Sequence, residues 1–113
     1  MKLTTSRVGR VVVVHVGEAR LTYPILADFA AAVTALINGG EPRIILDLSP
    51  VNYLDSATIG CLMDLYRQAT AAGGNIKLAG VQKRVETMLT MTGAQNFLEV
   101  HADRASALAS FGG

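Results

Sequence analysis

The chain is expected to fold as a single α/β domain over residues 1–113, because strand-like and helix-like stretches alternate along it. Residues 11–16 and 43–48 are rich in β-branched and aliphatic side chains, which is typical of strands buried within a sheet. Between and after them, apolar residues recur every three or four positions, as on one face of a helix. Strands separated by helices pair in parallel through right-handed crossovers. We therefore expect a mostly parallel sheet with packed helices.

The first half of the chain predicts two strands and a helix. Residues 2–6 form a weak strand, expected at a sheet edge, and residues 11–16 form a strand covered on at least one face. Residues 24–38 change to helical spacing. Pro24 fits the first turn of that helix, where a missing N–H costs nothing, and the glycines at 39–40 end it.

The second half continues the alternation. A strand over 43–48 leads into a loop over 49–53, since Pro50 cannot join a β-ladder. A helix is expected from Ser56 to the glycine pair at 73–74. The remaining expected elements are a strand over 75–80, a helix whose apolar stripe is Val81, Val85, Met88 and Leu89, a short strand over 97–100, and a last helix capped by Asp103.

Composition narrows the classes of partner. A net charge of +1 gives no reason to expect a nucleic acid or an anionic membrane surface. The single cysteine, Cys61, rules out an internal disulfide and fits a reducing compartment; we expect it to be buried and inert. No apolar run is long enough to span a bilayer, and the N-terminus lacks a signal-peptide pattern. We therefore expect a cytoplasmic location without membrane insertion.

No cofactor or metal site is expected. The two histidines, His15 and His101, and the lone cysteine have no zinc-ligand spacing. Both glycine pairs follow helices rather than precede them, so they indicate helix ends and not phosphate-binding loops.

Two catalytic interpretations are weak. A hydrolase would use Ser56 with His15 or His101 as base, but the G-x-S-x-G turn is missing. A receiver-type domain would use Asp47 as phosphoacceptor, but no acidic pair accompanies it to hold magnesium. We therefore do not expect an enzyme.

The pair Asp55–Ser56 directly precedes a predicted helix. Both residue types are preferred N-caps, so capping alone explains the pair. A hydroxyl in the first helical turn also faces unpaired N–H groups and the positive end of the helix dipole. A phosphate there would carry about −1.5 to −2 charges and could be held by those donors. Local physics thus leaves Ser56 as either a cap or a modified hydroxyl.

Two stretches, IILDLSPVNYLDSATIGCLM (44–63) and AAGGNIKLAGVQKRVETMLTMTGAQNFLEV (71–100), resemble the STAS domains of bacterial anti-sigma-factor antagonists. An Ala-rich last helix follows, as in that family. The most specific features are the Leu-Asp-Leu strand, the Asp-Ser pair that opens a helix, the turn at 73–74, and the Thr92–Gly93 turn before Phe97. The resemblance implies a mixed sheet with helices packed mainly over one face.

The resemblance also implies partner switching. In this family the unphosphorylated antagonist binds an anti-sigma factor that is a serine kinase, and so frees a sigma factor. Phosphorylation of the serine after the aspartate separates the complex, and a serine phosphatase is an expected second partner. The phosphoacceptor position matches Ser56, supported by Asp55 and Thr58, and the expected partner-binding surface includes Tyr53, Leu54 and Ile59.

This chain departs from the family pattern at two places. Thr58 replaces a residue that is often glycine, and so adds a second hydroxyl in the first helical turn; whether it competes with Ser56 as phosphoacceptor is left open by the sequence. Gly60 is retained, which suits close contact between helix and sheet. Arg20 stands near a position where many members are acidic, which would alter the choice of partner.

The resemblance leaves a second function open. The chain could be a STAS domain without a phosphorylation switch, acting as an accessory subunit of a transport complex or as a scaffold. In either role we expect a monomer or a weak homodimer.

Overall fold

The computed structural model describes residues 1–112, and their elements follow the expected alternation. In chain order they are β1 (Leu3–Val8), β2 (Val11–Val16), β3 (Arg20–Leu21), α1 (Tyr23–Asn38), β4 (Arg43–Asp47), β5 (Tyr53–Leu54), α2 (Ser56–Ala71), β6 (Asn75–Ala79), α3 (Lys83–Thr92), a 3₁₀ turn (Ala94–Asn96), β7 (Glu99–His101) and α4 (Arg104–Ser110).

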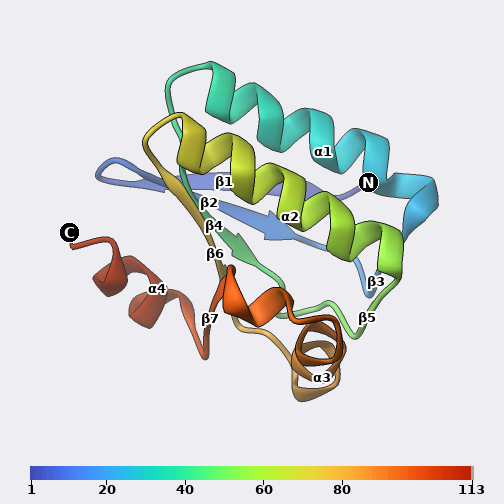
Figure 1. Ribbon diagram of the computed structural model, residues 1–113. Coiled ribbons are helices and arrows are strands. Elements are labelled where there is room, and N and C mark those ends of the chain that lie inside the picture. Colours follow the sequence, from blue (N-terminus) through green and yellow to red (C-terminus); the bar gives the residue numbers. More distant parts are fainter. Residues whose placement is uncertain (113) are drawn as a thin grey trace.

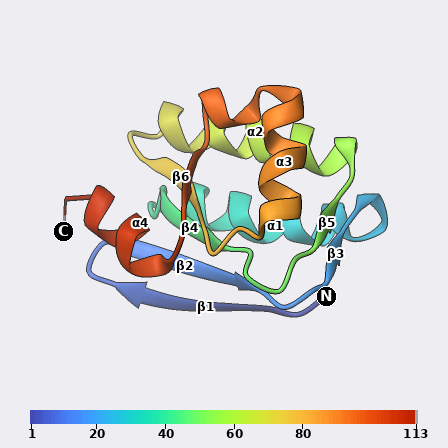
Figure 2. The same cartoon turned by 90° about the horizontal axis from the view of Figure 1, so that it is seen from below.

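The main sheet has five strands in the order β1-β2-β4-β6-β7. The hairpin partner β1 runs antiparallel to β2, whereas β2, β4, β6 and β7 are parallel to one another. Helices α1, α2 and α3 pack over one face, and the short α4 packs on the other (Figures 1 and 2). The expected mixed, mostly parallel sheet with helices mainly on one face is confirmed.

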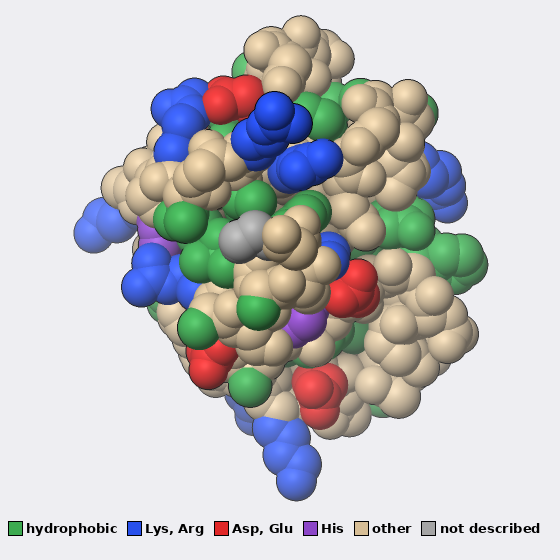
Figure 3. Space-filling view, turned by 90° about the vertical axis from the view of Figure 1, so that its left-hand side faces the viewer, with side chains coloured by type: hydrophobic (Ala, Val, Ile, Leu, Met, Phe, Trp, Pro, Cys, Tyr) green, Lys and Arg blue, Asp and Glu red, His purple; other side chains and the backbone are tan. Residues whose placement is uncertain are grey.

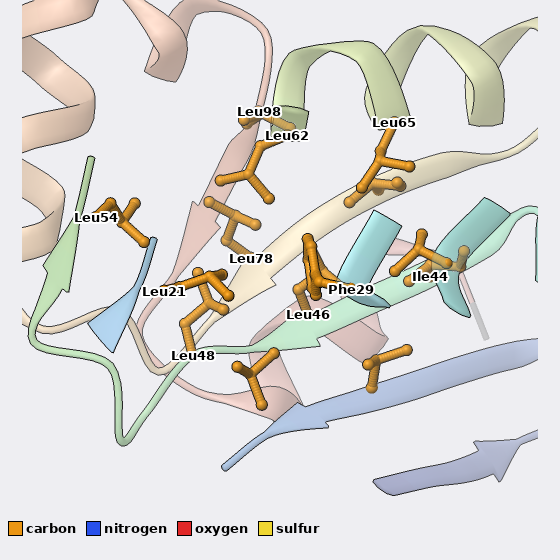
Figure 4. Packing of buried hydrophobic residues seen from close by; sticks show 14 of the residues in the cluster. Leu21, Phe29, Ile44, Leu46, Leu48, Leu54, Leu62, Leu65, Leu78 and Leu98 are labelled. Atoms are coloured by element: carbon orange, nitrogen blue, oxygen red, sulfur yellow. The ribbon is translucent and has the colours of Figure 1, made fainter. Parts of the chain in front are cut away.

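The hydrophobic core follows the alternation of side chains along each strand. In β2, Val12, Val14 and Val16 face α1 and α2, and Val11 and Val13 face α4. The larger cluster lies under α1 and α2, where Phe29 and Leu62 are fully buried (Figure 4). Because β2 is covered on both faces, its run of valines needs no polar alternation.

Two expectations about the loops were wrong. The predicted loop over 49–53 ends in a short strand, β5, which pairs in parallel with β3 to form a second, two-stranded sheet. The strand expected over 97–100 begins only at Glu99, because the 3₁₀ turn continues to Asn96 and leaves Phe97 55% exposed. Strands of two residues show no periodicity, so hydrophobic patterning cannot reveal them.

Gly74 permits a close approach between two loops. It follows the left-handed Gly73, and a Cβ built on it would overlap the carbonyl of Pro42. The N–H of the next residue, Asn75, donates to that same carbonyl at 3.0 Å and so aligns β6 beside β4.

Gly74→Ala should therefore destabilise the domain by about 1–3 kcal/mol, the usual cost of overpacking. Gly60→Ala is the matched control: a Cβ there would meet nothing, and alanine is the better helix former by about 1 kcal/mol. Urea unfolding of both variants measures the difference. A Gly74→Ala protein as stable as wild type would contradict this role.

Candidate functional site

Asp55, and not Ser56, caps helix α2. Asp55 has an extended backbone, and its Oδ1 accepts the Thr58 N–H at 2.9 Å, which is the usual N-cap bond. Ser56 is the first helical residue and its side chain is exposed. Its hydroxyl makes no hydrogen bond within residues 1–112. The capping role that the sequence left open for Ser56 therefore belongs to its neighbour.

Asp55 also ties together the N-termini of two helices. Its Oδ2 accepts the backbone N–H of Tyr23, the first residue of α1, at 2.8 Å. Thr22, the N-cap of α1, forms no side-chain capping bond of its own. One carboxylate thus satisfies otherwise unpaired N–H groups of both helices. The contact was not foreseen, because it joins residues 32 positions apart.

The ionised form of Asp55 is the favoured one. Partial burial alone would raise the pKa of this carboxyl, but hydrogen bonds from the Thr58 hydroxyl and from the Tyr23 and Thr58 N–H groups outweigh it. The pKa therefore lies below its usual value. At neutral pH the residue before Ser56 therefore carries a negative charge.

Thr58 faces the interior. It is fully buried, and its Oγ1 lies 2.8 Å from the Leu21 carbonyl and 2.6 Å from Asp55 Oδ1. These contacts link α2 to β3 and hold the capping carboxylate in place. The expectation that Thr58 presents a second hydroxyl beside Ser56 is contradicted for the folded domain, since no surface of Thr58 is accessible.

The expected partner-binding surface is only partly at the surface. Leu54 and Ile59 are 3% and 8% exposed and belong to the core, where Figure 4 shows Leu54. Tyr53 is half-buried, and the guanidinium of Arg20 lies over its ring at 4.3 Å. The pairing of β3 with β5 places these two residues side by side. This cation–π pair is the exposed part of the small sheet.

A groove between α1 and α2 adjoins Ser56. It has a volume of about 670 Å³. Tyr23, at one end, is 74% exposed, and Gly60 is also exposed. The expectation that Gly60 allows close contact between helix and sheet was wrong, because a Cβ there would meet nothing within 4 Å. Cys61, expected to be buried, is half-buried in this groove, and burial raises the pKa of its thiol.

The residues considered for other chemistry lie elsewhere. His15 contacts Ser6 and Asp47, and His101 contacts Ser106 and Glu99, so neither histidine is a base for Ser56. Within residues 1–112 no group of three His, Cys, Asp or Glu side chains is placed to hold a metal ion. In the same part of the chain, no helix has both the length and the apolar character needed to cross a membrane.

The family model of the STAS domain matches residues 2–107. The chain belongs to the STAS domain family. Among curated relatives, a Thermotoga neapolitana protein is 28% identical over 72 residues, or 64% of each chain, and a Thermotoga maritima protein is 26% identical over 65 residues, or 58% of each. Both are provisionally named anti-sigma factor antagonists. The matched stretches thus span less than two thirds of these relatives.

Solved structures share the fold over nearly the whole chain. An anti-sigma-factor antagonist (STAS) domain protein from Planctomyces limnophilus has a TM-score of 0.88 at 18% identity, covering 98% of each chain. The Bacillus antagonist SpoIIAA matches in its unphosphorylated form with a TM-score of 0.81 at 19% identity (97% of this chain, 96% of that one), and in its phosphorylated form with 0.74 at 18% (97% and 99%).

The murine anion transporter Slc26a9 contains a similar domain. It has a TM-score of 0.71 at 21% identity, covering 92% of this chain and 18% of the transporter. At these identities the structural matches establish a common fold and nothing further.

Asp55→Ala should destabilise the domain by about 2 kcal/mol, the upper part of the range for lost caps, because N–H groups of two helices lose their acceptor. Ser56→Ala removes a hydroxyl that has no partner in the described part of the chain, and should change the unfolding free energy by less than about 0.5 kcal/mol. Urea unfolding compares the two variants. Equal losses of stability in the two variants would show that Asp55 and Ser56 share the capping role.

Stability should fall as the pH drops below about 4. The folded-state pKa of Asp55 is depressed, so its contribution is fully present above the unfolded-state pKa, about 3.9, and is lost as the pH falls through the lower folded-state value. Asp47 and Glu99 are shifted in the same direction. Urea unfolding between about pH 6 and pH 2 should show a shallower decline for Asp55→Asn than for wild type. Identical slopes would contradict the role of Asp55.

Proposed function

We propose that this chain is an anti-sigma-factor antagonist whose binding is switched by phosphorylation of Ser56. The observation that carries the proposal is the separation of roles at the start of α2: Asp55 caps the helix, and the exposed Ser56 hydroxyl has no hydrogen-bond partner among residues 1–112. A hydroxyl that the fold does not need can be modified without loss of the cap. The relatives named as antagonists support this assignment.

The electrostatics of the site suit a reversible switch. A phosphate on Ser56 would face the first N–H groups of α2 and the positive end of the helix dipole. It would also add charge beside the ionised Asp55, which opposes it. Because these effects oppose each other within the domain, the fold is expected to survive, and the new charge acts mainly on whatever covers this surface.

The proposed partners are an anti-sigma factor with serine-kinase activity and a serine phosphatase. In the unphosphorylated state the kinase would cover Ser56, the adjoining groove and the Arg20–Tyr53 pair. The guanidinium of Arg20 would favour a partner that presents an acidic group there. The named relatives and the SpoIIAA fold support this class of partner.

A second candidate function rests on the match to a domain within an anion transporter. In that role the chain would be a phosphorylation-independent accessory or scaffold subunit. Its complex would not respond to ATP, whereas a kinase complex would separate as Ser56 becomes phosphorylated. Size-exclusion chromatography of the native complex with and without ATP distinguishes the two.

Ser56→Asp should abolish binding to the cognate anti-sigma kinase while leaving the fold intact, because a permanent negative charge mimics the phosphorylated state. Pull-downs from native lysate with wild type, Ser56→Ala and Ser56→Asp measure this effect. Recovery of the same partners by wild type and Ser56→Asp would contradict the switch. Intact-mass analysis of protein from its own cells, followed by peptide mapping, should place phosphate on Ser56 and none on the buried Thr58.

A further inference from the structure

A serine, a histidine and an aspartate meet on the α4 face of the sheet, away from Ser56. Ser6 in β1, His15 in β2 and Asp47 in β4 lie on neighbouring strands. Ser6 Oγ is 3.2 Å from His15 Nε2, and His15 Nδ1 is 3.1 Å from Asp47 Oδ2. The strand register explains why the three side chains meet. His15 pairs directly with Asp47, and Ser6 pairs with Val13, which lies two residues before His15 on the same face of β2. The switch proposed for Ser56 uses none of the three.

Hydrogen bonding determines the tautomer of His15. The side chain of Asp47 is 14% exposed, and its Oδ1 accepts the Ser49 N–H at 3.0 Å. Burial would raise the pKa of this carboxyl, but hydrogen bonds from Ser49 and His15 outweigh it and keep the pKa low. An ionised carboxylate can only accept, so Nδ1 must carry a proton. In the neutral ring Nε2 is then a free acceptor directed at the Ser6 hydroxyl.

We propose that Ser6, His15 and Asp47 form a nucleophilic site that hydrolyses small carboxylic esters. Their order and contacts are those of a Ser–His–Asp triad, which is recognised by geometry and not by sequence position. Ser6 is exposed and lines an open cavity of about 530 Å³ together with Val13, Arg104 and other residues of β1 and α4. Figure 3 shows one side of the molecule, on which apolar surface lies among Lys and Arg side chains.

The reaction proceeds through an acyl-enzyme. Ser6 Oγ forms a bond to the ester carbonyl carbon while His15 Nε2 takes the hydroxyl proton. The tetrahedral intermediate collapses by breaking the bond to the alcohol oxygen, and His15 returns the proton to that leaving group. Water then attacks the acyl-Ser6 with the same base, releases the carboxylic acid and restores Ser6. Asp47 orients the ring and stabilises the imidazolium.

The sheet edge supplies a donor for the developing oxyanion. The Gly17 N–H donates to the Lys2 carbonyl at 2.8 Å, so Lys2 is a β1 residue whose backbone is hydrogen-bonded to β2. Every second residue of β1 after Lys2 then bonds to β2 in the same way. By the alternation of an antiparallel ladder, Ser6 bonds to β2 and the N–H of Arg7 points out from the open edge. A backbone N–H directly after a nucleophile is a recurring oxyanion donor. The Arg104 side chain also lines this cavity, and its Nε lies 4.0 Å from Asp47 Oδ2.

The chain contains its own control. Ser106, His101 and Glu99 are joined in the same order, at 2.7 and 3.1 Å. There the carboxylate is 50% exposed and is shared with the ammonium group of Lys77, whereas the carboxylate of Asp47 is 14% exposed. We assign no nucleophile to Ser106.

The test is covalent labelling of the full chain with a fluorophosphonate, which forms a phosphorus–oxygen bond to an activated serine and releases fluoride. Peptide mass mapping should place the label on Ser6. Ser6→Ala should abolish labelling, and His15→Gln and Asp47→Asn should slow it by about 100-fold or more, as expected for loss of an oriented general base. Ser106→Ala and Ser56→Ala should label at the wild-type rate.

Urea unfolding must first show that each variant is folded, and acetyl transfer from p-nitrophenyl acetate to Ser6 provides a second readout by mass. Three results would each overturn the proposal. They are an unlabelled wild type, a label on any residue other than Ser6, and a labelling rate that His15→Gln leaves unchanged. Each would reduce the cluster to a structural hydrogen-bond chain. None would bear on the switch proposed at Ser56, which does not involve this face.

Discussion

The carboxylate of Asp55 is the interaction on which the proposed switch depends. With one oxygen it caps α2 through Thr58, and with the other it receives the first N–H of α1. Two helix starts that are far apart in the chain are thereby fixed against each other. Because Asp55 makes these bonds, the cap of α2 does not depend on the Ser56 hydroxyl. A switch residue placed at the cap itself would couple every phosphorylation event to the stability of the helix.

The buried Thr58 supports this arrangement from beneath. Its hydroxyl contacts both the carboxylate of Asp55 and the carbonyl of Leu21 in β3. Glycine at this position would leave that carbonyl and the carboxylate without the hydroxyl. The departure from the family motif therefore does not change the accessible surface. Compared with glycine, Thr58 restricts the backbone at this position and adds a hydrogen-bonded link between the two-stranded sheet and the start of α2.

Hydrophobic patterning was sufficient to predict most of the fold. The run of valines in β2 and the helical spacing after Pro24 each indicate a face that is buried over many residues. A pattern of that length can be recognised in the sequence. The pairing of β3 with β5 could not be predicted, because two residues have no period. Nor could the burial of Leu54, which depends on where β5 settles on the core. Sequence located the start of α2 but not which of Asp55 and Ser56 caps it.

Gly60 illustrates the same limit and carries a functional consequence. A glycine inside a helix costs about 1 kcal/mol relative to alanine, and it is usually explained by a close internal contact. Among residues 1–112 Gly60 has no such contact, since the position opens into the groove between α1 and α2. The stability given up inside the domain therefore has no compensation inside the domain. Compensation from outside requires a partner that approaches α2 at Gly60 more closely than a methyl group would permit. Gly60 lies one helical turn from Ser56. The proposed kinase must cover this same surface to reach the Ser56 hydroxyl.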